Sequence, residues 1–525
     1  MKHYILNSKI TVLFALLVAL VSCEENLLDT DLTTINRNEP TPETTLSTPS
    51  GFYGFAKGVY EHMEAELLWI TWGFHESMGD VCFIPWGNYG SRWSNTPTSY
   101  ILDNGTTVTA PGGVTQEGQI AIFNSRAAGE GNMTQYEWGE MYKLISQANV
   151  MLSAIDNINF TGDAETEKKA ATAWALWWKA YGYSRVGSMY DQGLIVNQPG
   201  EVSNDYVDQS LIIQEANQIL DELIAVLNSV SNSGSFNSTL STNYTLGILS
   251  GNSPNLDSFK KLAYSMKARN ILVNKKANEM TSSDWQNVLD IAENGLQIGD
   301  NSNTFIMKEE STFLDDAWIV GLTVYGWYFP SPRLIQDFRP GDARLERDYN
   351  ETSAQVNIRG RGLNFGTQWT YETIENGGSF STIEDNLGTM YYSPTYEENE
   401  LMLAEAKIRL GRIDEGLSHL DNVRSYQGAN LAPTSGTGLT QDQAIEELRS
   451  ERRIALTFRG VAFYDARRWG VSSGSRENSW ILSLNDEGTS VIFNTNATIN
   501  YNYLDYWPVT AFETDFNPIP TTGTE

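Results

Sequence analysis

The sequence predicts a mainly α-helical protein, because apolar residues recur with a helical period in two long blocks. The first block contains five such stretches, at residues 138–155, 165–183, 211–227, 259–272 and 285–298. The second stretch is apolar on nearly every side, which is typical of a helix buried in a core. Ser283 stands where the N-cap of the fifth helix is expected.

Shorter helices form the second block. Residues 401–408 and 414–423 have helical apolar patterns, and Gly411 between them is expected to end the first helix. Two short helices joined at a glycine form a hairpin of tetratricopeptide type, although the residue period of that repeat is not kept here. Thr440 and Gln443 form a capping box at the start of a further helix, which runs to Phe458. We therefore expect degenerate helical hairpins as the scaffold.

Long stretches rich in Gly, Asn, Ser and Thr separate the helices. They comprise residues 73–131, 228–257, 301–395 and 471–525. Loops of this length in a folded domain are usually functional or disordered, and their aromatic content argues against disorder. The sequence thus predicts one domain at residues 51–525, with a helical and loop-rich part at about 51–395 and a helical C-terminal part at about 396–525.

The N-terminus has the features of a lipoprotein signal. Lys2 and Lys9 precede an apolar run, Ile10 to Val21, of about 12 residues, whereas a membrane span needs about 20. Leu20-Val21-Ser22-Cys23 resembles the lipobox of bacterial lipoproteins, in which the cysteine is diacylated and anchors the chain. We expect residues 1–22 to be the signal and 23–50 a lipid-anchored tether. The alternative is an ordinary secretory signal with a chance cysteine.

Composition excludes several classes of partner. The formal net charge is −30, which argues against binding to nucleic acid or anionic lipid, since both need a basic surface. It also disfavours a polyanionic ligand, unless Lys and Arg gather locally. Cys82, between Val81 and Phe83, is expected to be a buried small hydrophobic residue.

No catalytic residue, metal site or cofactor site is predicted. The four histidines form no metal-binding spacing, and there is no phosphate-binding or dinucleotide-binding glycine motif. Gly470-Val-Ser472-Ser-Gly474 matches a nucleophile motif, but it follows a helix and no histidine comes after it. A pair of catalytic carboxylates, as in glycoside hydrolases, has no sequence signature among 65 acidic residues.

Aromatic residues interleaved with amides and arginine are the positive signal for a ligand. The 15 Trp and 25 Tyr residues are an excess, part of which is expected to pack in the core, and two clusters lie in the predicted loops. Sugar rings stack their C–H faces on aromatic planes, while their hydroxyl groups need fixed polar partners. The candidate ligand-binding residues are Trp72, Trp86, Asn88, Tyr89, Arg92, Trp93, Trp318, Tyr325 and Trp327. The alternative is that these aromatics pack in the core or contact a partner protein.

Four segments resemble the SusD/RagB family of nutrient-binding lipoproteins. They are the lipobox with Glu24 and Glu25 after it, the segment 138–149, the segment 451–470, and the segment 506–518. The third is the most specific, since Glu451-Arg452-Arg453, Phe458, Gly460 and Asp465-Ala-Arg467-Arg468-Trp469 follow the family signature almost position by position. Arg459 stands where the family often has Glu.

In that signature the arginines are expected to be structural. Arg452, Arg453, Arg467 and Arg468 can clamp loops onto the scaffold through carboxylates and carbonyl groups. Asn149 is likewise expected to join its helix to a loop.

The resemblance implies a SusD-like helical fold and a glycan-binding role at the cell surface, without catalysis. The protein would be anchored in the outer membrane through Cys23 and would pass an oligosaccharide to a SusC-like, TonB-dependent transporter. Alternatives are capture of peptides, as in RagB-like proteins, and a lipid-anchored glycosidase.

Overall fold

The computed structural model describes residues 45–64, 68–85, 87–244, 253–303, 305–308, 328–356, 366–380, 389–485 and 489–520. Residues 47–525 form a single unit, to which the elements below belong. The predicted signal, Cys23 and most of the tether 23–50 lie outside the described residues. In the described part the chain is mainly helical, and this confirms the predicted fold class.

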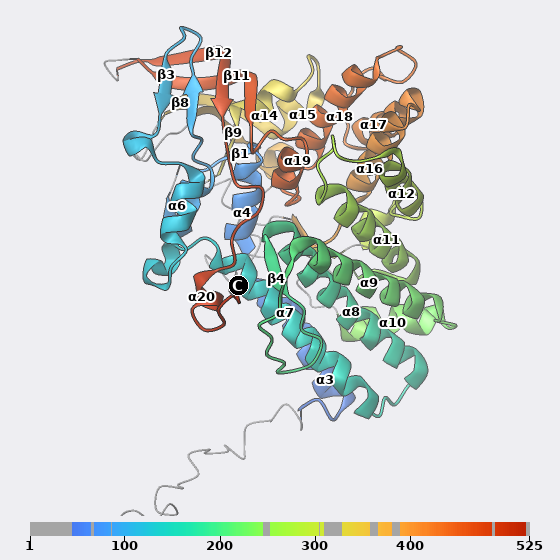
Figure 1. Ribbon diagram of the computed structural model, residues 1–525. Helices are drawn as coiled ribbons and strands as arrows, with labels where there is room; N and C mark the ends of the chain where they lie inside the picture. Colours follow the sequence, from blue (N-terminus) through green and yellow to red (C-terminus); the bar gives the residue numbers. More distant parts are fainter. Residues whose placement is uncertain are drawn as a thin grey trace, which may run out of the picture. The chain divides into compact units, whose positions relative to one another are not determined.

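Eight helices in the described part form a row in which each packs against the next (Figure 1). They are α7 (Gln135–Ala154), α8 (Ala164–Met189), α9 (Gln209–Asn228), α11 (Leu256–Val273), α12 (Ser282–Ala292), α16 (Tyr396–Arg409), α17 (Ile413–Tyr426) and α18 (Gln441–Ala455). Each predicted helical stretch in the two blocks corresponds to one of these helices. The row is consistent with helical hairpins as the scaffold.

Helix boundaries follow local chemistry at three places. Gly411 adopts φ +81° just after α16 and lets the chain turn into α17. Thr440 and Gln443 form the predicted capping box of α18. At α12 the prediction is wrong by two residues: Thr281 is the N-cap, in a capping box with Asp284, and Ser283 lies inside the helix.

Helix α8 is buried along most of its length, as its apolar pattern predicts. Trp174, Trp177 and Trp178 are fully buried, and the ring of Trp177 stacks on Phe305 with centroids 4.7 Å apart. Close approach of α7 and α8 depends on Gly182, because a Cβ at this position would lie 2.7 Å from Cγ1 of Ile145.

Other helices lie outside this row, and six of them occupy sequence that was predicted as loop. The six are α5 (Ser91–Ser94), α6 (Gln116–Phe123), α10 (Ser233–Asn243), α14 (Pro332–Asp337), α15 (Ala343–Asp348) and α20 (Ala511–Thr514), with 3-10 turns such as η2 (Asn88–Gly90). The helices α3 (Pro49–Glu64), α4 (Leu68–Met78) and α19 (Ala462–Arg468) also lie outside the row.

The strands are short and antiparallel. Four form one sheet in the order β11 (Ser475–Leu484), β12 (Val491–Asn500), β2 (Ser99–Ile101) and β3 (Thr107–Thr109). The others form two-stranded pairs: β1 (Cys82–Phe83) with β7 (Phe329–Pro330), β4 (Gln192–Leu194) with β5 (Tyr206–Asp208), β6 (Ile306–Lys308) with β10 (Thr389–Tyr391), and β8 (Tyr349–Gln355) with β9 (Thr367–Tyr371). The β11–β12 hairpin corrects the expectation of a loop after residue 471.

The arginines of the C-terminal signature are structural, as predicted. Arg468 donates both Nη groups to Glu405, at 2.9 and 2.6 Å, and its Nε to Asp465 at 2.7 Å. Arg467 donates to the backbone carbonyls of Ser188, Val273 and Asp505, which ties three separate segments together. These clamps hold α19 against the row of helices.

Two further expectations about single residues are confirmed. Asn149 donates from Nδ2 to the carbonyl of Val196 at 2.9 Å and so joins α7 to a loop. Cys82 is a free, buried thiol, and burial raises its pKa well above the ordinary value. A thiol in this state is a small hydrophobic residue and not a nucleophile.

Candidate functional site

The residues predicted to bind ligand fall into three groups in the structure. Trp86, Trp318, Tyr325 and Trp327 lie outside the described residues. Trp72, on α4, is 1% exposed and packs against Tyr392, with the guanidinium of Arg185 4.7 Å from its ring centroid. An indole buried on all sides has no face for a ligand, so Trp72 belongs to the core and leaves the candidate set.

Asn88, Tyr89, Arg92 and Trp93 are brought together on one turn by η2 and α5. Tyr89 adopts φ +57°, which is unusual for a residue with a side chain. The Trp93 ring stacks on Phe123 with centroids 5.8 Å apart, and the Arg92 guanidinium lies 4.7 Å from its centroid. Because these two contacts take up much of the indole surface, Trp93 offers a ligand less area than the sequence suggests.

A cavity of about 570 Å³ lies elsewhere, between the C-terminal helices and the strands β8 and β10. We call it the Arg459 cavity. Its lining consists of Phe338, Arg344, Arg347, Asp348, Tyr349, Ser379, Phe380, Tyr391, Glu397, Tyr426, Gln427, Ile454, Ala455, Thr457, Phe458 and Arg459. The volume is in the range of small-molecule sites, and the lining mixes aromatic rings with charged and amide groups.

Aromatic side chains form one part of this lining. The guanidinium carbon of Arg459 lies 3.6 Å from the centroid of the Tyr391 ring. Tyr426 is 43% exposed and is supported from behind by Tyr396, edge to face at 5.1 Å between centroids. Phe458 packs against Phe380 at 5.4 Å. The supported, half-open ring of Tyr426 is the surface best placed to stack on a ligand.

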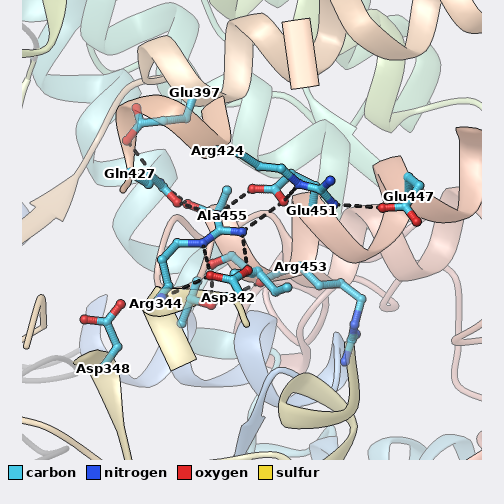
Figure 2. Close-up of polar contacts among 12 residues, drawn as sticks. Asp342, Arg344, Asp348, Glu397, Arg424, Gln427, Glu447, Glu451, Arg453 and Ala455 are labelled. Atoms are coloured by element: carbon cyan, nitrogen blue, oxygen red, sulfur yellow. Dashed lines mark hydrogen bonds and ion pairs between the residues drawn. The ribbon is translucent and has the colours of Figure 1, made fainter. Parts of the chain in front are cut away.

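A buried ion network fixes the part of the lining that contains Arg344 (Figure 2). Arg344 donates to both oxygens of Glu451, at 2.5 and 3.0 Å, and to both oxygens of Asp342, at 3.0 and 2.8 Å. Arg424 donates to Glu451 at 2.8 Å. Burial alone would lower the pKa of Arg344, but Glu451 and Asp342 outweigh it and raise that pKa, so the guanidinium stays charged.

Hydrogen bonds also hold the polar side chains that face the cavity. Gln427 accepts from Arg344 at 3.0 Å and donates to the carbonyl of Ala455 at 3.1 Å. Arg347 grips Asp348 through two hydrogen bonds, of 2.9 and 2.7 Å. The lining is therefore preorganised, and a ligand would meet donors and acceptors already in place.

The turn that carries Arg459 is held by a buried carboxylate. Glu76, on α4, is fully buried and accepts the backbone N–H groups of Phe458 and Gly460, at 3.1 and 3.0 Å. Burial raises the pKa of Glu76 to about 7, although both N–H donors and the nearby Arg459 and Arg453 lower it in part. Phe458 has φ +58° and Gly460 has φ +68°, so the chain reverses sharply around Arg459.

A smaller cavity of about 330 Å³ lies beside α18 and β11 and is lined by Arg449, Arg453, Trp469 and Arg476, among others. Its arginines have partners: Arg453 donates to the carbonyls of Gly79 and Asp80, and Arg476 donates to Asp337.

Within the described residues, no group of His, Cys, Asp and Glu side chains could hold a metal ion.

Comparison with known proteins gives the family. Residues 396–523 match the model of the SusD family. Two SusD-like carbohydrate-binding proteins of known structure are similar over their whole length. The one from Bacteroides vulgatus is 14% identical, with 90% of this chain and 97% of that chain covered and a TM-score of 0.54. The one from Bacteroides fragilis is 15% identical, with 90% and 99% covered and a TM-score of 0.57.

A further SusD-like protein from Bacteroides fragilis is 14% identical, with 92% of this chain and 98% of that chain covered and a TM-score of 0.58. No curated protein matches the chain. The matched segment contains the signature of clamping arginines described above. The C-terminal part of the chain is of the SusD family. Its fold is SusD-like, as the resemblance implies.

Within this SusD-like fold, sequence reasoning missed the Arg459 cavity. Tyr391, Tyr426 and Arg459 were not among the candidate residues. One signal was present, since Arg459 departs from the family signature, where Glu is frequent. The structure places that departure in the lining of the Arg459 cavity.

Proposed function

We propose that the protein captures carbohydrate without chemical conversion, as the binding subunit of an outer-membrane import complex. The observation that carries this proposal is the preorganised Arg459 cavity, where the half-exposed ring of Tyr426 faces fixed donors and acceptors. A sugar needs this combination, because its C–H face stacks on a ring while its hydroxyl groups require hydrogen-bonding partners. The SusD-like proteins of similar fold described as carbohydrate-binding support the same ligand class.

Capture without catalysis agrees with the state of the two carboxylates in the cavity. Asp348 accepts from Arg347 on both oxygens and also from Ser379 at 2.7 Å. Glu397 accepts from Asn301 at 2.8 Å and from Gln427 at 3.4 Å. A glycoside hydrolase needs one carboxyl group that donates a proton and another that attacks or activates water. Carboxylates held in this way serve better as fixed acceptors for hydroxyl groups.

The position of the protein in the cell is part of the proposal. Cys23 would carry the acyl chains that anchor the protein in the outer membrane, with the folded part at the cell surface. None of the helices in the described part has the length and hydropathy of a membrane span. A SusC-like, TonB-dependent transporter would receive the captured sugar. The match to the SusD family supports both assignments.

The test is binding of the full chain, purified in detergent, to a panel of soluble polysaccharides and oligosaccharides, with product analysis in the same samples. We expect saturable binding of at least one saccharide and no released product. Tyr426→Ala should weaken that binding about tenfold or more, equal to about 1.4 kcal/mol, while the control Tyr264→Ala, on α11 outside the cavity, should not. Release of shorter sugars, or binding of peptides and no saccharide, would overturn the proposal.

A further inference from the structure

Arg459, unlike Arg333 and Arg468, has no carboxylate of a described residue in its fork. Arg333 grips Asp80 at 2.8 and 2.6 Å, and Arg468 grips Glu405 at 2.9 and 2.6 Å. In the described part, the one carboxylate within 4 Å of the Arg459 guanidinium is that of Glu397, at 3.9 Å from Nη2, which is too long for a hydrogen bond. Its side chain makes no hydrogen bond to any described residue.

Glu397 does not satisfy this guanidinium, because its own oxygens are engaged. Oε2 accepts from Asn301 and Oε1 from Gln427. Its side chain is only 4% exposed, so there is little room for it to rotate toward Arg459. The 3.9 Å separation is therefore a property of the packing, and no described residue occupies the fork of Arg459.

The side chain of Arg459 is held in place, whereas a solvated surface arginine moves freely. Its side chain is 17% exposed and places the guanidinium over the Tyr391 ring, and Glu76 holds the backbone on both sides of it. A guanidinium that is preorganised in this way loses little entropy when it binds an anion. Its planar fork matches a carboxylate, with two parallel N–H donors for two oxygens.

A second arginine reinforces this preference. Arg347 lines the same cavity with a side chain that is 35% exposed, and its hydrogen bonds to Asp348 and the Gln427 carbonyl use three of its five N–H donors. The chain as a whole carries a formal charge of −30, which repels anions at long range. That repulsion is screened over about 8 Å at physiological salt, so two local arginines decide what the cavity accepts.

We propose that the Arg459 cavity selects a sugar unit that carries a carboxylate, a hexuronic acid, with Arg459 binding the carboxylate and Tyr426 stacking on the ring. This rests on the proposed function, since it names the class of saccharide that the cavity captures. Ser379, Thr457 and Gln427 line the cavity and offer partners for the hydroxyl groups of the same unit.

The experiment compares hexuronic acid oligosaccharides with the same oligosaccharides after their carboxyl groups are reduced to hydroxymethyl groups. Both are titrated into the full chain in detergent. We expect the acidic form to bind at least about tenfold more tightly, because a hydrogen-bonded charge contributes about 1.5 kcal/mol or more. Arg459→Gln should bring the two forms to within about twofold, and Arg459→Glu should make the acidic form the weaker ligand.

Arg412→Gln is the matched control, since Arg412 is an exposed arginine paired with Glu415 before α17. It should keep the preference for the acidic form. Equal affinity for the acidic and reduced forms in the unmodified chain would overturn this inference and leave the proposed function standing. Absence of binding to every saccharide would overturn both. A preference that survives Arg459→Gln would place the carboxylate elsewhere and also overturn the inference.

Discussion

Glu76 accepts the backbone N–H of Gly460 at 3.0 Å, from a helix that lies 384 residues earlier in the chain. Its other oxygen accepts the N–H of Phe458 at 3.1 Å. The two hydrogen bonds bracket Arg459 and hold a turn in which Phe458 has left-handed backbone angles, a conformation that costs about 1 kcal/mol or more. A buried carboxylate thus fixes the residue that we assign to ligand selection.

The first prediction concerns stability and pH. Burial raises the pKa of Glu76 from 4.5 to about 7 in the folded protein. As pH rises from 4.5 to 7, the unfolded chain loses this proton first, so the contribution of Glu76 to the free energy of unfolding falls. The total fall is about 3 kcal/mol, from 1.36 kcal/mol per pKa unit, and no further change is expected above pH 7.

Glu76→Gln removes the titrating group and gives the comparison. We expect the free energy of unfolding of the unmodified chain, minus that of Glu76→Gln, to shrink as pH rises from 4.5 to 7. Equilibrium denaturation across this range measures the difference. If this difference in the free energy of unfolding stays constant or grows as pH rises, the pKa of Glu76 is not raised in the folded protein.

The helical scaffold could be predicted because short stretches of sequence determine where each helix lies. The buried faces of α7 and α8 appear in the sequence as apolar residues with a helical period, and the capping box at Thr440 marks the start of α18. The roles of Arg467 and Arg468 followed from chemistry, since buried guanidinium groups must find carboxylates or carbonyls. These features depend on few long-range contacts.

The candidate site could be predicted only in part, because its geometry is tertiary. Trp72 was grouped with loop aromatics, but it lies on α4 under Gly460, where a Cβ would come 2.9 Å from the indole. The Arg459 cavity joins residues from 338 to 459, and no periodicity shows that Tyr391, Tyr426 and Arg459 share a wall. The β11–β12 hairpin was missed although its sequence is rich in β-branched residues, because no Asn-Gly or similar two-residue turn marks it.

Removal of the buried charge behind the cavity should destabilise the fold. Glu451 is fully buried and accepts hydrogen bonds from two guanidinium groups. Glu451→Gln would remove the negative charge that compensates the buried positive charges of Arg344 and Arg424. We expect a loss of about 3–5 kcal/mol in the free energy of unfolding, measured by chemical denaturation. Glu415→Gln, at an exposed pair with Arg412, should change it by less than about 1 kcal/mol. Similar losses for both variants would contradict the buried network.

Two glycines on neighbouring helices should respond in opposite directions to alanine. Gly182→Ala should destabilise the protein by about 1–3 kcal/mol, because its Cβ would meet Ile145 at 2.7 Å. Gly139→Ala, on the exposed side of α7 with no atom within 4 Å of the new Cβ, should stabilise it by up to about 1 kcal/mol. Thermal unfolding of the two variants measures both effects. A stabilising Gly182→Ala would show that α7 and α8 are not closely packed there.

The turn with Asn88, Tyr89, Arg92 and Trp93 is the competing location for the ligand. Because Arg92 and Phe123 already cover much of the Trp93 ring, we expect Trp93→Ala to change saccharide affinity by less than about threefold, in the binding assay used for Tyr426→Ala. A large loss with Trp93→Ala and none with Tyr426→Ala would move the binding surface to this turn.

The central claim is that a saccharide binds, unchanged, in the Arg459 cavity. The most direct measurement is a crystal structure of the protein with the oligosaccharide that binds best in the panel. We predict an intact sugar in the cavity, with one ring against Tyr426 and a carboxylate in the fork of Arg459. An empty cavity with the sugar bound at another surface, or a cleaved sugar in the cavity, would contradict the account.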